Sequence, residues 1–378
     1  MPVKIFFILL FIPLLGTAQS RGKARSFGIQ IGVMNPGKWN AITDVQGVKV
    51  GHFTWVRGKD IRTGVTAIVP HGENVFLNKV PAAIWVGNGF GKLAGYTQVR
   101  ELGNLESPII LTNTLGVGTA LEALVEYTLK QPGNENVRSV NGVVGETNDG
   151  YLNNIRALPI GKDHVWKALE GAKEGPVEEG AVGAGTGTVC FGFKGGIGTS
   201  SRVLPPSLGG YVVGVLVQSN FGGALTIDGV PIGEELGQYF LHDKLGDKAD
   251  GSCMIVVATD APLDSRNLER LAKRAMLGLG RAGGIGSNGS GDYVIAFSTA
   301  PQVRIKQEQD DPLVSMAVLR NDAMSPLFMA VIEATEEAII NSLFQAQTMM
   351  GMEGREVPGL PLGRVLELME KHQALQKK

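Results

Sequence analysis

The stretch "DKADGSCMIVVATDAP", residues Asp247–Pro262, joins a charged, turn-like segment directly to an apolar run. The charged part ends at Gly251-Ser252, and the run from Cys253 onward has the length and composition of a buried strand. Two interpretations of Gly251-Ser252 are open at this point. It is either an ordinary turn before a strand or a site at which the chain cleaves itself.

The composition describes a large globular chain without a nucleic-acid or metal signal. Its 378 residues, 43% hydrophobic and 19% charged, suffice for one large buried core or two closely packed ones. The formal net charge of -1 contains no basic excess of the kind that binds nucleic acid. The five histidines and two cysteines lack zinc-site spacing, so we expect no metal and no cofactor.

The first residues, "MPVKIFFILLFIPLLGTAQS", have the pattern of a secretory signal peptide. A basic start is followed by an apolar stretch at 5–15 and by small residues up to Ala18. The apolar stretch is shorter than the ~20 residues that a membrane span needs, and Pro13 interrupts it. We therefore expect a periplasmic or secreted protein that loses residues 1–18, does not associate with the membrane afterwards, and keeps a single domain, 19–378.

The two cysteines lie in apolar, strand-like runs, Cys190 in "TVCFGF" and Cys253 in "SCMIVV". An exported protein can form a disulfide from such a pair. Free cysteines are nevertheless among the most buried residue types, and both runs read as core strands. We therefore predict two buried thiols.

Apolar runs and helical periodicities alternate along the chain. Short apolar runs that end in Gly, Asn or Pro predict buried strands at 63–70, 82–89, 107–114, 209–222 and 291–300, besides the run that follows Ser252. Apolar residues at helical spacing predict helices at 115–133, 165–175, 265–284 and 325–351. This order predicts sheets covered by helices, an α+β layered fold.

Self-cleavage at Gly251-Ser252 has a definite chemistry. In an N-to-O acyl shift the serine hydroxyl attacks the preceding carbonyl, and water then hydrolyses the ester. Glycine before the serine removes Cβ crowding and tolerates a distorted backbone. The product is an N-terminal serine whose α-amine, with an unperturbed pKa of roughly 7.7–8, can act as general base without a histidine.

The dipeptide alone still favours a plain turn. Gly-Ser also occurs at 286–287 and at 289–290, and neither of those pairs needs a catalytic explanation. Only Ser252 opens directly into a strand with no spacer, which would hold a nucleophile rigidly.

Several ordered blocks of the chain resemble the L-aminopeptidase/D-esterase (DmpA-like) family of self-processing N-terminal serine hydrolases, which includes the β-aminopeptidases. The blocks are "NAITDVQGVKVGH", "GETNDGYLN", "GAGTGTVCFGFKGGIGTSSR", "GVLVQSNFG", "DGSCMIVVATDAPL", "NGSGDYVIAFST" and "EATEEAIINSL". The resemblance covers most of the mature chain. It implies a four-layer αββα sandwich and cleavage at Gly251-Ser252 into an α chain (19–251) and a β chain (252–378).

The resemblance also implies roles for individual residues. Ser252 would be the nucleophile, and its freed amine would be the base. Asn220, in "QSNFG", matches an oxyanion-binding asparagine, and Tyr151, in "NDGYLN", matches a tyrosine that contacts the substrate. Ser290 and Asp292, in "NGSGD", match a Ser-x-acid pair near the nucleophile. The acid is glutamate in the β-aminopeptidases, so the aspartate departs from their pattern.

Plainer interpretations of these residues remain open. Asn220 could simply end a strand, and Tyr151 could be a half-buried packing residue. Glu146 or Asp149 could hold the free ammonium group of a substrate, or either could be a solvated loop acid. A backbone N–H in "GIGTS", 196–200, is our expectation for a second oxyanion donor.

We therefore expect an exported aminopeptidase or amidase that releases N-terminal residues from short peptides, amino acid amides or esters through an acyl-enzyme on Ser252. One alternative is an acyl or aminoacyl transferase with the related ornithine acetyltransferase-like fold, which uses a threonine nucleophile. The other alternative is a non-catalytic binding protein. The family resemblance further implies a homo-oligomer of αβ units.

Overall fold

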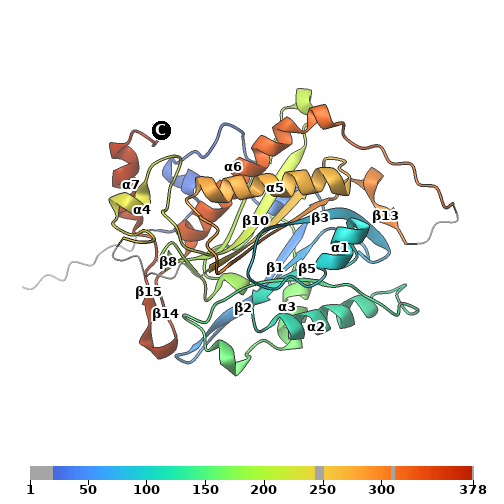
Figure 1. Ribbon diagram of the computed structural model, residues 1–378, viewed down its shortest axis with the longest axis horizontal. Coiled ribbons are helices and arrows are strands. Elements are labelled where there is room, and N and C mark those ends of the chain that lie inside the picture. Colours follow the sequence, from blue (N-terminus) through green and yellow to red (C-terminus); the bar gives the residue numbers. More distant parts are fainter. Residues whose placement is uncertain (1–19, 243–250, 308–310, 377–378) are drawn as a thin grey trace, which may run out of the picture.

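Two β-sheets lie face to face, and helices cover the outer face of each sheet (Figure 1). The computed structural model describes residues 20–242, 251–307 and 311–376. The expected signal peptide, residues 1–18, lies outside the described residues. The layers follow in the order α, β, β, α, which confirms the predicted sandwich.

The smaller sheet has the strand order β1-β2-β5-β6. Its strands are β1 (Lys49–Arg57), β2 (Ile61–Val69), β5 (Ile109–Asn113) and β6 (Val143–Thr147). Its covering helices are α2 (Val117–Leu129) and α3 (Lys162–Glu170), below the sheets in Figure 1. Ile110, Leu124 and Val165 belong to the apolar core between this sheet and its helices. Burial of that core holds the helical layer on the sheet.

The larger sheet has the order β13-β3-β12-β11-β10-β9, with β4 paired to β3. Its strands are β3 (Asn78–Gly89), β4 (Asn104–Leu105), β9 (Gly196–Val203), β10 (Val212–Asn220), β11 (Gly251–Thr259), β12 (Ser290–Ser298) and β13 (Ile305–Lys306). Helices α5 (Ser265–Arg281) and α6 (Ser325–Gln345) cover it, above the sheets in Figure 1. Strands β11 and β12 are parallel, and α5 makes the crossover between them.

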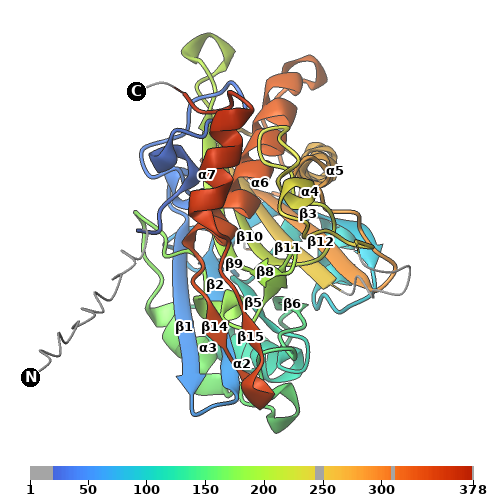
Figure 2. The same ribbon diagram turned by 90° about the vertical axis from the view of Figure 1, so that its left-hand side faces the viewer.

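The remaining α-helices and strands are short and lie at the edges of the sandwich. They are α1 (Tyr96–Leu102), α4 (Ile232–Glu235), α7 (Leu362–Lys371), and the strand pairs β7 (Val189–Cys190) with β8 (Phe193–Lys194) and β14 (Met349–Met350) with β15 (Glu356–Val357). Figure 2 shows β14 and β15 running along the side of the molecule from the α6 and α7 end toward the smaller sheet. A hydrogen bond of 2.7 Å from Arg62 Nε to the Met350 carbonyl attaches β14 to β2.

The side chains of β11 alternate between two cores. Cys253 and Ile255 belong to the core between the larger sheet and its helices, whereas Met254 and Val256 belong to the core between the sheets. Because side chains alternate along a strand, Ser252 shares the inter-sheet face with Met254. The strand thus presents the serine at the end of the space between the sheets.

Both cysteines are buried, free thiols, as predicted. Burial raises the pKa of the Cys190 thiol to about 12 and raises the pKa of Cys253 well above its ordinary value. Neither is a reactive thiolate at neutral pH. Within the described ranges, no helix is both long and apolar enough to cross a membrane.

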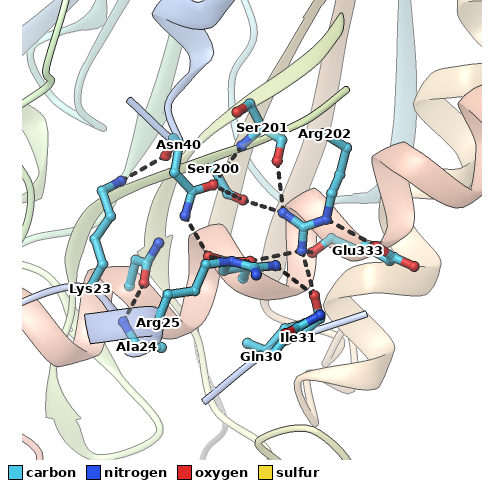
Figure 3. Close-up of polar contacts among 12 residues, drawn as sticks. Lys23, Ala24, Arg25, Gln30, Ile31, Asn40, Ser200, Ser201, Arg202 and Glu333 are labelled. Atoms are coloured by element: carbon cyan, nitrogen blue, oxygen red, sulfur yellow. Dashed lines mark hydrogen bonds and ion pairs between the residues drawn. The ribbon is translucent and has the colours of Figure 1, made fainter. Parts of the chain in front are cut away.

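A buried ionic cluster fastens strand β9 and the N-terminal segment to helix α6 (Figure 3). The Arg202 guanidinium is fully buried, and it donates to Glu333 Oε2 at 3.0 Å and to Glu337 Oε2 at 2.7 Å. Arg25 Nε donates to Glu337 as well, at 2.9 Å. Arg202 precedes the Gly251-Ser252 junction and both glutamates follow it, so the cluster would join the α and β chains after a cut.

We expect Arg202→Met to lower the free energy of unfolding by about 3–5 kcal/mol, because it leaves the buried Glu333 carboxylate without its cation and removes one of the two arginines that pair with Glu337. The measurement is urea denaturation, made in a Ser252→Ala background so that single chains are compared. Arg364→Met is the control, because Arg364 and its partner Glu367 are both mostly exposed. A loss no larger than that of the control, about 0.5 kcal/mol, would contradict a stabilising cluster.

Candidate active site

A pocket of ≈ 1130 Å³ opens at the end of the sandwich where β11 begins and β10 ends. Five of the predicted site residues line it: Gly251, Ser252, Asn220, Tyr151 and Glu146. They come from three separate stretches of the chain, 146–151, 220 and 251–252, and the two sheets bring them together. The pocket is large enough to enclose a small-molecule or short-peptide substrate.

Ser252 lies in the middle of three adjacent strands. Its Cα partner on antiparallel β10 is Asn220, and its partner on parallel β12 is Gly291. The Ser252 hydroxyl donates to the carbonyl oxygen of Gly251 at 2.5 Å, and it accepts from the Gly291 N–H at 3.2 Å. The side chain is 5% exposed, and that small surface faces the pocket. The hydroxyl is thus held against the peptide group that self-cleavage would cut.

Steric crowding by backbone atoms requires glycine at position 251. A Cβ at this position would lie 2.6 Å from Phe221 Cα and 2.7 Å from the Asn220 carbonyl oxygen, both of which are backbone atoms. The φ angle of Gly251 is not among the positive values in the described chain, so a left-handed conformation is not what calls for glycine here. The glycine instead permits close approach of β11 to the end of β10.

The side-chain amide of Asn220 has a defined orientation. The backbone N–H of Val189 donates to Asn220 Oδ1 at 3.0 Å. Because an N–H can only donate, the atom it meets is the amide oxygen, and the Nδ2 donors are left for the pocket that Asn220 lines. Directly opposite residues in an antiparallel pair have Cβ atoms roughly 4.5–5.5 Å apart. Asn220 can therefore donate to an oxyanion that forms on a carbonyl group bound next to Ser252.

Glu146 supplies the buried carboxylate of the pocket. It lies on β6, its side chain is 3% exposed, and its Oε1 accepts from the Lys92 N–H at 2.9 Å. The Lys92 ammonium is 3.8 Å from the same oxygen and is itself 55% exposed. Burial raises the pKa of Glu146 above its ordinary value. A buried carboxylate at a pocket wall is suited to an incoming ammonium group.

Asp149 does not line the pocket. The sequence alone did not distinguish it from Glu146 as the acid that could hold a substrate ammonium group. Asp149 is 1% exposed, and Asn153 Nδ2 donates to its Oδ1 at 2.9 Å. Burial raises its pKa to about 7, against the opposing effect of the nearby Lys194 cation. Of the two acids, Glu146 is therefore the one that a substrate in this pocket can reach.

Tyr151 lies at the rim of the pocket with 53% of its surface exposed. The Arg355 guanidinium lies 5.2 Å from the centre of its ring. This stacking ties the rim of the pocket to the loop between β14 and β15.

Ser290 and Asp292 form a hydrogen-bonded pair behind Ser252. Ser290 Oγ donates to Asp292 Oδ1 at 2.8 Å, and both residues are 1% exposed. Asp292 alternates with Val294, which belongs to the core on the helix side, so the pair lies on the face opposite Ser252 and does not line the pocket. The group of β12 that reaches the Ser252 hydroxyl is the Gly291 N–H between them.

The segment 196–200, where we expected a second oxyanion donor, does not lie at the pocket. That segment is part of β9, the edge strand beyond β10, and none of its residues lines the pocket. Two backbone donors close to Ser252 are the N–H groups of Val189 and Gly291, which donate to Asn220 Oδ1 and to the Ser252 hydroxyl. Sequence reasoning missed both because main-chain donors carry no side-chain signal. Among the described residues, no group of three or more His, Cys, Asp or Glu could hold a metal ion.

A serine at the start of a buried strand, an asparagine amide opposite it and a buried carboxylate in one pocket define a serine hydrolase site on an αββα fold. The model of peptidase family S58 matches residues 40–357. This chain belongs to that family, and it is an aminopeptidase.

Three known proteins illustrate the relationship. The chain is 39% identical to the beta-peptidyl aminopeptidase BapA of Sphingosinicella microcystinivorans over 388 residues, 96% of each chain. A Burkholderia sp. beta-aminopeptidase has a TM-score of 0.85 and 40% identity, covering 93% of this chain and 99% of its own. The L-aminopeptidase D-Ala-esterase/amidase of Ochrobactrum anthropi has a TM-score of 0.86 and 35% identity, covering 94% and 99%. That protein is described as a prototype serine aminopeptidase with a variant of the Ntn-hydrolase fold. The transferase and binding-protein alternatives gain no support from these relatives.

Proposed function

We propose that this aminopeptidase is exported after removal of residues 1–18, cleaves itself between Gly251 and Ser252, and acts through the new N-terminal serine. Its substrates are short peptides, amino acid amides or esters with a free amino group, and it works as a homo-oligomer of αβ units. The observation that carries the proposal is the Ser252 hydroxyl, which lies 2.5 Å from the Gly251 carbonyl oxygen at the wall of a large pocket.

Self-cleavage would proceed through an ester. The Ser252 oxygen bonds to the carbonyl carbon of Gly251, the carbon–nitrogen bond breaks, and the hydroxyl proton ends on the released nitrogen. Water then adds to the ester carbon and releases Gly251 as a carboxylate. Ser252 becomes an N-terminal residue with its hydroxyl and α-amine side by side.

Turnover would reuse the same groups. The Ser252 hydroxyl attacks the carbonyl carbon of the first residue of the substrate, and the α-amine of Ser252 takes its proton. Asn220 Nδ2 donates to the oxyanion. The proton passes to the leaving amine, and water hydrolyses the acyl-enzyme to free the N-terminal residue and restore Ser252.

Glu146 would select substrates with a free amino group. Its carboxylate lies in the pocket that contains Ser252, which supports an ion pair with the ammonium end of the substrate. The relatives named above include a beta-peptidyl aminopeptidase and an L-aminopeptidase. Substrates of both kinds present an ammonium group close to the scissile carbonyl and differ in the carbon atoms between them.

We expect Glu146→Gln to raise KM for aminoacyl p-nitroanilides about tenfold or more, because it removes one charge-assisted contact worth roughly 1.5–3 kcal/mol. In the native enzyme the ammonium contact needs a deprotonated Glu146, whose pKa burial has raised. KM should therefore rise as the pH falls through that raised pKa, and Glu146→Gln should lose this dependence. The measurement is a set of KM values from acid to neutral pH.

The matched control is Glu367→Gln, an exposed glutamate paired with Arg364 on the surface. N-acetylated substrates, which have no ammonium group, should be poor for the native enzyme and unaffected by Glu146→Gln. An unchanged KM in Glu146→Gln would contradict the ammonium site.

A further inference from the structure

The hairpin of β7 and β8 sits directly against the end of β10. Its turn residues, Phe191 and Gly192, have φ angles of 53° and 79°, which makes a tight two-residue turn. The Phe191 N–H donates to the Phe221 carbonyl at 2.8 Å, and the Val189 N–H donates to Asn220 Oδ1 at 3.0 Å. The hairpin is therefore the structure that sets the orientation of the Asn220 amide.

Lys194, the last residue of the hairpin, is fully buried. Its Nζ donates to the carbonyl oxygens of Gly185 at 2.9 Å, Thr188 at 2.8 Å and Gly195 at 2.8 Å. An ammonium has three donors, and here each donor has a carbonyl acceptor. A neutral amine would turn a lone pair toward one of these oxygens, so the arrangement is built for the cation.

One peptide group joins Lys194 to Asn220. The Thr188 carbonyl accepts from Lys194 Nζ, and the Val189 N–H of the same peptide donates to Asn220 Oδ1. The described chain contains no cis peptide, so this carbonyl and this N–H point in opposite directions. The Lys194 ammonium, the Thr188–Val189 peptide and the Asn220 amide therefore form one continuous series of hydrogen bonds. The series ends at Asn220 Nδ2, which faces the pocket.

We propose that Lys194 is a positioning residue for oxyanion stabilisation: its ammonium fixes and polarises the Thr188–Val189 peptide, which holds the Asn220 Nδ2 donors toward the pocket. Hydrogen bonds in series strengthen one another in a medium of low dielectric constant. Donors that are already oriented need no reorganisation when charge develops on the substrate. This inference rests on the proposed role of Asn220.

The charge balance around Lys194 supports a functional explanation. Burial lowers the pKa of Lys194 to about 7, and the Asp149 carboxylate opposes that shift. An apolar residue of similar length would avoid this desolvation cost. The chain nevertheless keeps a cation against the Thr188 carbonyl, which also accepts from the Gly195 N–H at 3.1 Å.

The test is kcat and KM of Lys194→Met on an aminoacyl p-nitroanilide, alone and combined with Asn220→Ala, per mole of β chain that begins at Ser252. We expect kcat to fall by about 10- to 100-fold with KM within about twofold, a part of the 10²–10³ typical of one lost oxyanion donor. In the Asn220→Ala background, Lys194→Met should lower kcat by less than a further factor of about two, because the two residues act through one contact.

The control is Lys79→Met, which removes another buried lysine, one that donates to the Phe76 carbonyl at 2.9 Å and does not line the pocket. Its kcat should stay within about twofold of the native value. The inference is overturned if Lys194→Met matches Lys79→Met, or if it lowers kcat equally with and without Asn220. An inactive native protein, or a fully active Asn220→Ala, would instead overturn the proposed function.

If Lys194→Met is not cleaved before Ser252, a second pair of variants tests the same inference. Lys194→Arg keeps a cation with several donors, whereas Lys194→Gln keeps two donors without the charge. With KM constant, kcat should follow the order Lys, Arg, Gln. Equal kcat values for the Arg and Gln variants would contradict the role of the ammonium.

Discussion

Ser252→Ala is expected to remain a single uncut chain and to lose aminopeptidase activity by at least about 10⁴-fold, the scale on which removal of a nucleophile acts in serine hydrolases. The hydroxyl lies 2.5 Å from the Gly251 carbonyl oxygen and lines the pocket. Its removal abolishes both the acyl shift and the acyl-enzyme. Denaturing gel electrophoresis and hydrolysis of an aminoacyl p-nitroanilide measure the two effects.

Ser287→Ala is the matched control, because Ser287 follows a glycine in another Gly-Ser pair. This variant should be cut normally and should keep its activity within about twofold. Cleavage of Ser252→Ala between the same residues, or retained activity in that variant, would contradict the role of Ser252.

Asn220→Ala should lower kcat by about 10²–10³ and leave KM nearly unchanged, because its amide donates to charge that exists only in the transition state. Asn220→Asp is the sharper variant. It keeps the oxygen that accepts from Val189 N–H, and it replaces the Nδ2 donors by an oxygen. We expect Asn220→Asp to lower kcat at least as much as Asn220→Ala does, although aspartate and asparagine have nearly identical shapes. Steady-state kinetics of processed protein decide the question, and an active Asp variant would exclude oxyanion binding by this residue.

The fold follows from the apolar patterns where the elements are long. The runs at 209–222 and 291–300 are strands β10 and β12, and the periodic stretch at 325–351 contains α6. The layer order followed from the family resemblance together with this order of elements. Strand β6 and helix α7 were not predicted, because β6 has only five residues and α7 lies among charged residues whose apolar stripe is narrow.

The candidate site could be predicted only in part. Asn220 lies at the end of β10 and Ser252 lies at the start of β11. The two residues are opposite each other because these strands pair in the larger sheet. Glu146 and Asp149 are three residues apart, and only the path of the chain after β6 decides which of them faces the pocket. Lys194 is a lone cation in a run of apolar residues and glycines, which indicates burial. Its partners are main-chain carbonyls, and no pattern of side chains identifies those.

Intact mass measurement with N-terminal sequencing of the purified native protein tests self-processing most directly. Two chains are predicted, one beginning at Gln19 and ending at Gly251, the other beginning at Ser252. The same experiment reports removal of the signal peptide through the first of these N-termini. A single uncut chain that still hydrolyses aminoacyl p-nitroanilides would contradict the N-terminal serine mechanism.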